Sequence, residues 1–222
     1  MDKKTIITVI KRTATGLVLG ALFWTSFAYL PPLFFSLVLL GIMMQIIFFE
    51  WRNLFDIKKA PFWLLMPLYP ILPFMLLMYM NHIPLYRNLL FILFIIVSAH
   101  DTGAYIIGML FGKHPIAPKI SPGKTWEGFL GGCVAAYVGL SLALWELGVA
   151  KSALFSLLFS MGVSALSASG DLFESWLKRR ARIKDTGSIL PGHGGFLDRF
   201  DGILFTVFFF YYFKDWLVKL FF

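Results

Sequence analysis

Residues Asp171–Gly202 read DLFESWLKRRARIKDTGSILPGHGGFLDRFDG and separate an apolar run over Ala153–Ser169 from a second run that begins at Ile203. Acidic and basic side chains crowd this stretch, although the chain on either side of it is strongly apolar. Ionisable groups at or near membrane depth are costly and tend to mark ion or substrate sites. We therefore expect the stretch to emerge from a membrane and to carry the functional site.

The composition is that of an integral membrane protein. Hydrophobic residues make up 59% of the 222 residues, and the mean hydropathy is +0.77, whereas soluble domains are roughly 45 to 50% apolar. At about 20 residues per helical span, the length allows six to eight spans and short loops. The apolar runs are continuous, which excludes the alternating strands of a membrane β-barrel.

We predict an all-α polytopic membrane protein with about seven transmembrane helices and a cytoplasmic N-terminus. The basic start resembles that of a signal peptide, but no convincing cleavage site follows, so we expect a retained first span. We treat residues 1–222 as a single membrane domain, with N-terminal spans in 1–87 and catalytic spans in 88–222 that carry cytoplasmic loops at 108–128 and 171–202. The first expected span continues to Tyr29 and beyond, until Pro31-Pro32 breaks the run. The others are Leu33–Phe49, Pro61–Met80, a run from Asn88, Phe129–Leu147, Ala153–Ser169 and a run from Ile203.

The basic residues agree with this trace, because cytoplasmic loops carry an excess of Lys and Arg. The four segments assigned to the cytoplasm hold sixteen of the 20 Lys and Arg residues. Lys214, Asp215 and Lys219 leave the exit side of the last span open.

Two spans carry unusual residues. Pro67, Pro70 and Pro73 indicate either a kinked third span or two half-spans. The fourth span is expected to end in the polar group Ser98, His100, Asp101 and Thr102.

One helix face should present a row of carboxylates at the start of the charged stretch. Asp171, Glu174, Ser175 and Lys178 lie at i, i+3, i+4 and i+7, which places them on one side of a helix. A solvated face on a helix at the membrane surface would show the same spacing. The later carboxylates favour a functional interpretation.

Asp198 and Asp201 follow the sequence His193-Gly194-Gly195 at the mouth of the last span. Converging carboxylates that leave room for water and phosphate oxygens are the usual Mg²⁺ ligands. Glycines allow a phosphate to approach backbone N–H groups, and basic residues neutralise phosphate charge. The combination indicates phosphoryl or nucleotidyl transfer, with the ligand set undecided among the carboxylates. The basic side chains available are Lys178, Arg179 and Arg199.

A basic loop after the fourth span offers further phosphate contacts. Gly123-Lys124-Thr125 resembles the end of a P-loop, but Pro118 stands where that motif needs glycine, which excludes a Walker ATPase. Ser121, Lys124 and Thr125 are available to a polyphosphate. A loop that contacts lipid headgroups would also be basic, as would the patch of Arg179, Arg180 and Arg182.

The run from Ser175 to Asp201 resembles the signature of the phosphatidate cytidylyltransferase family, the CDP-diacylglycerol synthases. The resemblance rests on Ser-x-Leu-Lys-Arg at its start, the Lys184-Asp185 pair, and His193-Gly194-Gly195-x-x-Asp198-Arg199-x-Asp201 at its close. Asp101–Tyr105 and Ser121–Gly128 are similar to further motifs of the family. The resemblance covers the C-terminal half to two thirds of the chain.

The resemblance implies a bacterial inner-membrane enzyme of phospholipid biosynthesis that converts CTP and phosphatidate to CDP-diacylglycerol and pyrophosphate on the cytoplasmic side. It implies Mg²⁺ as the cofactor, with K⁺ as a second ion at the same site. The implied partners include membrane lipids but no nucleic acid, and the sequence also allows a homodimer. The implied metal ligands are Asp171, Asp198 and Asp201. The implied catalytic residues are Lys178, His193, Asp198 and Arg199, and the implied substrate-binding residues are Ser121, Lys124, Thr125, Arg179, Gly194 and Gly195.

Two other functions use similar residues. A CTP-dependent lipid kinase would transfer the γ-phosphate to a lipid alcohol with comparable Lys and Asp residues. A divalent-ion transporter would need carboxylates in the middle of its spans, whereas we expect these carboxylates at the cytoplasmic ends.

Overall fold

The computed structural model describes residue 18, residues 20–190 and residues 194–222. Most of the basic N-terminal segment and His193 lie outside the described residues.

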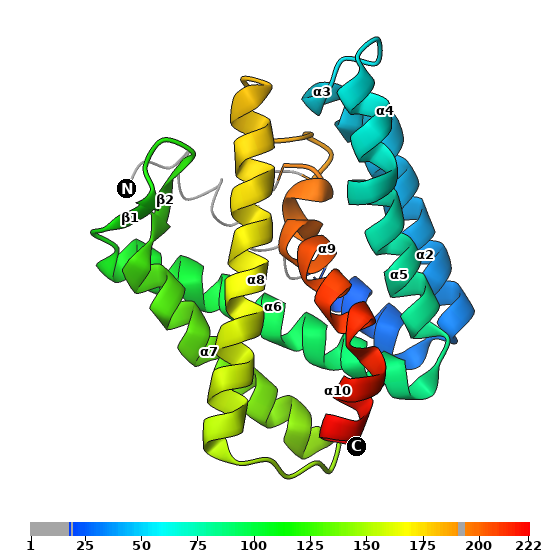
Figure 1. The fold of residues 1–222 in the computed structure, drawn as a ribbon, viewed down its shortest axis with the longest axis vertical. Helices are drawn as coiled ribbons and strands as arrows, with labels where there is room; N and C mark the ends of the chain where they lie inside the picture. The colour runs from blue at the N-terminus through cyan, green and yellow to red at the C-terminus, as the bar shows by residue number, and fades with distance from the viewer. Residues whose placement is uncertain (1–17, 19, 191–193) are drawn as a thin grey trace. The chain divides into compact units, whose positions relative to one another are not determined.

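The described chain is mostly helical (Figure 1). Residues 20–29 form a helical segment. The elements that follow are α2 (Pro32–Gln45), the π-helical η1 (Ile46–Glu50), α3 (Trp51–Leu54), α4 (Ala60–Met66), the π-helical η2 (Pro67–Ile71), α5 (Leu72–Asn81), α6 (Pro84–Phe111), β1 (Pro115–Ala117), β2 (Ser121–Thr125), α7 (Trp126–Glu146), α8 (Ala153–Arg180), α9 (Leu197–Tyr212) and α10 (Lys214–Phe221).

Five helical segments in the described part of the chain are long and apolar enough to cross a membrane. They are Pro32–Leu54, Ala60–Asn81, Pro84–Phe111, Trp126–Glu146 and Ala153–Arg180. Each corresponds to a span expected from the sequence, which confirms a multi-pass helical membrane protein. The count of seven spans and the cytoplasmic N-terminus stay predictions.

The three prolines of the second candidate span do not divide it into half-spans. Helical structure runs from Ala60 to Asn81, and Pro67 and Pro70 lie within η2. Proline has no N–H to donate to the residue four positions earlier, so the helix needs a local change of hydrogen bonding there. The π-helical turn provides this change within one segment.

Helix α6 continues well beyond the polar end expected near Thr102. It runs to Phe111 and ends before Gly112, so His100 and Asp101 lie inside the helix. The helix can continue through these polar residues because its backbone hydrogen bonds do not depend on the identity of the side chains.

A β-hairpin occupies most of the segment that we expected to be a loop between α6 and α7. Strands β1 and β2 pair antiparallel, with Pro115 opposite Thr125 and Ala117 opposite Ser121. The N–H of Trp126 donates to the carbonyl of His114 at 3.0 Å and closes the hairpin against the start of α7.

The described chain forms two compact units, each assembled from two separate stretches. The first unit combines the described residues up to His82 with those of Leu177–Phe200, and the second combines Ile83–Trp176 with Asp201–Phe222.

In the first unit, α2 packs beside α5 (Figure 1). The Phe200 ring lies against Phe23 and Phe74, with ring centroids 5.8 and 5.4 Å away. The side chain of Asn81 is buried and donates to the carbonyl of Pro32 at 2.7 Å. The start of α9 is thus packed against helices from the N-terminal part of the sequence.

In the second unit, α6 and α7 form an extensive contact and are joined by the hairpin (Figure 1). The ring of Phe159 on α8 contacts Phe210 on α9 and Phe221 on α10, with centroids 6.2 and 5.0 Å apart. These contacts hold α8 beside α9, where the carboxylates of the second unit meet.

Candidate functional site

Three carboxylates of the second unit form a group that we call the carboxylate cluster: Asp171 and Glu174 on α8, and Asp201 on α9. One oxygen from each residue lies within 4.8 Å of the others. Glu174 and Asp201 are buried, and Asp171 is half-buried. Asp171 and Asp201 were expected together from the sequence, whereas Glu174 was seen only as part of the carboxylate row.

Two glycines allow α8 and α9 to approach closely at this cluster. A side chain at Gly170 would overlap Phe205 and the backbone of Asp201, and one at Gly202 would overlap Ser167. Each glycine directly adjoins a member of the cluster in the sequence. The close helix contact therefore brings Asp201 beside Asp171 and Glu174, one helical turn apart on α8.

The cluster has the electrostatics of a cation site. Burial raises the pKa of Asp201 well above its ordinary value, and the negative charges of Asp171 and Glu174 raise it further. Buried like charges at this separation need a proton or a cation between them. Oxygen ligands from three carboxylates suit a hard divalent ion such as Mg²⁺.

The hairpin places a lysine directly on the cluster. Lys124, in strand β2, forms an ion pair with Asp171. The hairpin is held by Glu127, whose carboxylate accepts from the N–H groups of Lys113 at 3.1 Å and His114 at 3.2 Å. The Ser121–Gly128 segment therefore contacts the carboxylate-bearing helix α8 within the second unit.

Ser121 and Thr125, expected to bind substrate, lie at the two ends of β2. The Thr125 hydroxyl accepts from the N–H of Gly128 at 3.2 Å and caps the start of α7. Its described role is structural.

A second group of predicted residues gathers in the first unit around Asp198. The ammonium of Lys178 lies 2.7 Å from Asp198 Oδ1. Asp198 Oδ2 accepts from the N–H of Gly195 at 2.7 Å and from the N–H of Thr186 at 3.0 Å, and it lies 3.0 Å from the Thr186 hydroxyl. Both oxygens of Asp198 are thus engaged by the protein itself.

These donors stabilise the ionised form of Asp198. Burial opposes ionisation, but the hydrogen bond and charge of Lys178, with the N–H groups of Gly195 and Thr186, outweigh it and hold the pKa of Asp198 below its ordinary value. Lys178 is in turn oriented by a charge-assisted bond.

The glycine pair serves the fold around Asp198. Gly194 has φ +81°, which favours glycine, and a side chain there would press on the Asp198 carboxylate. The N–H of Gly195 donates to Asp198.

The other predicted basic residues are near the surface. Arg199 is exposed. Arg179 is also exposed, and it donates to the carbonyl of Ile183 at 3.2 Å.

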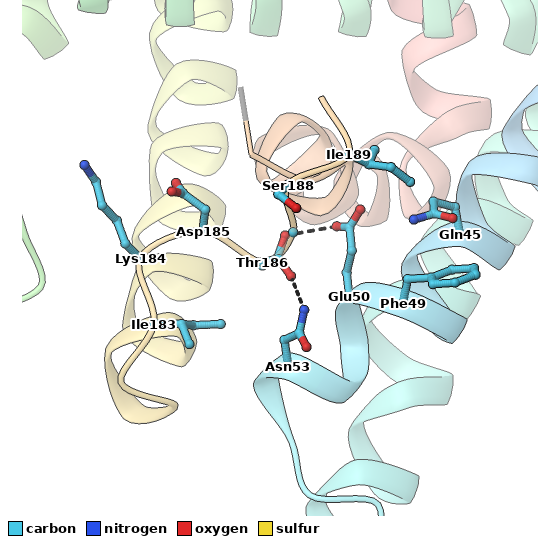
Figure 2. Close-up of a pocket in the computed structure, with 11 residues that line it drawn as sticks. Gln45, Phe49, Glu50, Asn53, Ile183, Lys184, Asp185, Thr186, Ser188 and Ile189 are labelled. Atoms are coloured by element: carbon cyan, nitrogen blue, oxygen red, sulfur yellow. Dashed lines mark hydrogen bonds between the residues drawn. The ribbon is translucent and has the colours of Figure 1, made fainter. Parts of the chain in front are cut away.

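Sequence reasoning missed Glu50 and Asn53. They border a pocket of about 850 Å³ whose other wall is residues 183–189 (Figure 2). Glu50 is buried and Asn53 donates to the carbonyl of Thr186 at 2.8 Å. A charged residue at the end of an apolar run is typical of the start of a loop, and nothing in the local sequence indicates a partner over a hundred positions away.

Residues 3–217 match the family described as the cytidylyltransferase family. The phosphatidate cytidylyltransferase of Haemophilus influenzae is 43% identical over 132 residues, which are 56% of this chain and 45% of the relative. That of Mycobacterium leprae is 46% identical over 114 residues, 51% of this chain and 36% of the relative.

These two alignments span less than half of each relative. The phosphatidate cytidylyltransferase of Rickettsia felis aligns almost throughout, at 35% identity over 201 residues, 88% of this chain and 87% of the relative. On both the family match and this alignment, the chain belongs to the cytidylyltransferase family.

Proposed function

We propose that the protein is a phosphatidate cytidylyltransferase, which joins CTP and phosphatidate into CDP-diacylglycerol and pyrophosphate for phospholipid biosynthesis. The relatives from Haemophilus influenzae, Mycobacterium leprae and Rickettsia felis carry this name. A multi-pass chain suits a lipid substrate, because the acyl tails can stay in the bilayer while the headgroup reaches the site.

The observation that carries the proposal is the carboxylate cluster with Lys124 beside it. Three carboxylates within 4.8 Å of one another suit a divalent ion, and a lysine at the same place suits a polyphosphate. This arrangement is typical of phosphoryl and nucleotidyl transfer.

We propose Asp171, Glu174 and Asp201 as the Mg²⁺ ligands, and K⁺ as a second ion at the same site, as the family resemblance implies. When bound, a divalent ion would neutralise phosphate charge and favour departure of pyrophosphate. Asp198 is a weaker candidate ligand than the sequence suggested, because Lys178, Thr186 and Gly195 already engage its oxygens.

In the proposed reaction, an oxygen of the phosphatidate phosphate attacks the α-phosphorus of CTP. The bond from that phosphorus to the oxygen bridging to the β-phosphate breaks, and pyrophosphate leaves with the electron pair. The protein's part is positioning and charge neutralisation. We assign phosphate contacts to Lys124, Lys178, His193 and Arg199, and further substrate contacts to Ser121, Thr125, Arg179, Gly194 and Gly195.

We place the enzyme in a bacterial inner membrane with about seven spans, a cytoplasmic N-terminus and a cytoplasmic active site. The distribution of Lys and Arg supports this orientation. Phosphatidate would then enter from the inner leaflet and CTP from the cytoplasm. A homodimer stays a prediction, which the mass of the purified protein in detergent tests.

The test is a reaction of purified protein with α-labelled CTP, phosphatidate and Mg²⁺. We expect labelled CDP-diacylglycerol and an equal amount of pyrophosphate. A lipid kinase would form no labelled lipid and, when given a lipid alcohol as acceptor, would leave the label in CDP. Absence of label from the lipid, with CDP or no product formed, would overturn the proposal.

A further inference from the structure

Glu50 is a buried carboxylate in the first unit that no sequence motif includes. It is the last residue of η1, and only 1% of its surface is exposed. Charged residues are almost never fully buried unless their charge is satisfied, so the contacts of Glu50 indicate what holds it there.

The partners of Glu50 are hydrogen-bond donors from the segment between α8 and α9, here called the loop, and from the start of α9. Oε1 accepts from the N–H of Phe196 at 2.8 Å. Oε2 accepts from the N–H of Leu197 at 2.9 Å and from the hydroxyl of Thr186 at 2.9 Å. Figure 2 shows the Glu50 and Thr186 side chains directed at one another.

The charge of Glu50 suits this place. The first N–H groups of a helix have no partner within the helix, and the helix dipole favours a negative charge there. A carboxylate that accepts both the Phe196 and Leu197 N–H groups satisfies two of these donors. In the described part of the chain, no Lys or Arg forms an ion pair with Glu50.

The loop is also shaped around the carboxylate. A side chain at Gly195 would overlap the Glu50 carboxylate, and one at Gly187 would press on its side chain. Asn53, one turn after Glu50, donates to the Thr186 carbonyl at 2.8 Å. Thr186 is therefore held through both its hydroxyl and its carbonyl.

Thr186 connects Glu50 to the residues expected to contact phosphate. Its hydroxyl lies 2.9 Å from Glu50 Oε2 and 3.0 Å from Asp198 Oδ2. Asp198 in turn holds Lys178 at 2.7 Å. The line of contacts runs from Glu50 through Thr186 and Asp198 to the lysine ammonium.

We propose that Glu50 is a positioning residue of the enzyme: it fixes Thr186 and the start of α9 at Phe196 and Leu197, and through Thr186 and Asp198 it orients Lys178 toward substrate phosphate. The role in catalysis rests on the proposed function, whereas the hold on the loop does not. Glu50 itself touches no substrate in this account.

The test compares Glu50→Gln with Asn81→Ala. Glutamine has nearly the same shape, but its amide NH₂ would face an N–H donor at one of the two oxygen positions. Asn81 is buried in the same unit and donates to Pro32 and Ser36, away from the loop. Both variants lose buried hydrogen bonds, and only one of them contacts residues 186–197.

Hydrogen exchange of peptides covering residues 186–197 is the first measurement, because it does not depend on activity. We expect Glu50→Gln to exchange at least about tenfold faster there than the parent, since a local opening equilibrium sets the rate. Asn81→Ala should leave this exchange unchanged. Unchanged exchange in Glu50→Gln would overturn the proposal.

The separate effects on kcat and KM are the second measurement. A misplaced phosphate contact can lower the rate by about 10²-fold, so we expect kcat of Glu50→Gln to fall by that order, with KM for phosphatidate within about threefold. Asn81→Ala should keep kcat within about threefold even where it lowers Tm. A full kcat in Glu50→Gln, or an equal loss in Asn81→Ala, would contradict the positioning role.

Glu50→Asp and Thr186→Val keep the test decisive if Glu50→Gln does not fold. Glu50→Asp keeps the charge and should recover part of the lost kcat. Thr186→Val removes the connecting hydroxyl and should lower kcat, as Glu50→Gln does. Because Thr186→Val keeps the Glu50 carboxylate, it should not speed the exchange at Phe196. If Thr186→Val keeps the parent's kcat, the connection through Thr186 is wrong. If the parent itself makes no CDP-lipid, the proposed function fails, and the exchange data alone decide whether Glu50 holds the loop.

Discussion

At the scale of single residues, the carboxylates of this protein divide into two kinds. Asp198 is satisfied by Lys178 and backbone N–H groups, whereas Asp171, Glu174 and Asp201 crowd one another. Sequence spacing predicted which residues share a helix face, because that follows from the helical period. It did not predict which carboxylate pairs with a lysine, because that depends on contacts between segments far apart in the chain.

The carboxylate cluster predicts that a divalent ion stabilises the fold. Adding Mg²⁺ to metal-free protein should raise the free energy of unfolding by about 2.7 kcal/mol at 100 times Kd, and should raise Tm accordingly. Asp201→Asn removes a carboxyl whose ionisation is opposed by burial and by Asp171 and Glu174, so its metal-free form should have a higher Tm than the parent and a smaller response to Mg²⁺. Thermal unfolding in EDTA and in Mg²⁺ measures both.

Asp215→Asn is the control, since Asp215 is exposed and contacts Tyr86. An Mg²⁺ response in Asp201→Asn equal to that of the parent would contradict the ligand assignment.

The Lys178–Asp198 pair predicts a large loss when only one partner is removed. Lys178→Met leaves Asp198 buried without its cation and should destabilise the protein by about 3–5 kcal/mol. The double variant Lys178→Met/Asp198→Asn should recover part of this loss. Denaturant or thermal unfolding of both single variants and the double variant measures the coupling. Strictly additive effects would show that the pair contributes nothing.

The lowered pKa of Asp198 predicts a dependence of stability on pH. A carboxyl whose folded pKa lies below its unfolded value, about 3.9, stabilises the fold above that value and loses the contribution as pH falls through the folded pKa. Tm should therefore fall in this acidic range, and less steeply in Asp198→Asn. Equal slopes in the parent and variant would contradict the shift.

At the scale of elements, the apolar runs predicted the helices well and the segments between them poorly. Five expected spans are present because a long apolar run has few alternatives in a membrane. The end of α6 was placed too early, since the polar residues near His100 do not break the helix. The β-hairpin was missed because its short strands, rich in Pro, Gly and Lys, carry no strand pattern.

The contact between α8 and α9 predicts different effects for two glycines on one helix. Gly170→Ala would overlap Phe205 and the backbone of Asp201, whereas a side chain at Gly162 meets nothing within 4 Å. Overpacking should destabilise Gly170→Ala by about 1–3 kcal/mol and lower activity by separating the carboxylates. Gly162→Ala should be neutral or stabilising by up to about 1 kcal/mol. Equal Tm and activity in the two variants would show that the helices do not need this close approach.

At the scale of the whole molecule, the membrane trace places the hairpin and the α7–α8 connection on opposite sides of the membrane. Lys119 and Lys151 are exposed and are separated in the chain by α7. In a Cys133→Ser background, a membrane-impermeant maleimide applied to intact cells should label Lys151→Cys and leave Lys119→Cys unlabelled until the cells are opened. Labelling of Lys119→Cys in intact cells would reverse the proposed orientation. Neither composition nor helix length determines this orientation, which rests on the distribution of basic residues.

The most direct test of the central claim is the transfer of α-label from CTP to phosphatidate by the parent, Asp201→Asn and Asp215→Asn side by side, with Mg²⁺ present. We predict labelled CDP-diacylglycerol from the parent and from Asp215→Asn, and a loss of at least about 10²-fold in Asp201→Asn, since several kcal/mol of charge stabilisation depend on the bound ion. Labelled lipid formed by Asp201→Asn as fast as by the parent would contradict the claim that the carboxylate cluster is the catalytic centre.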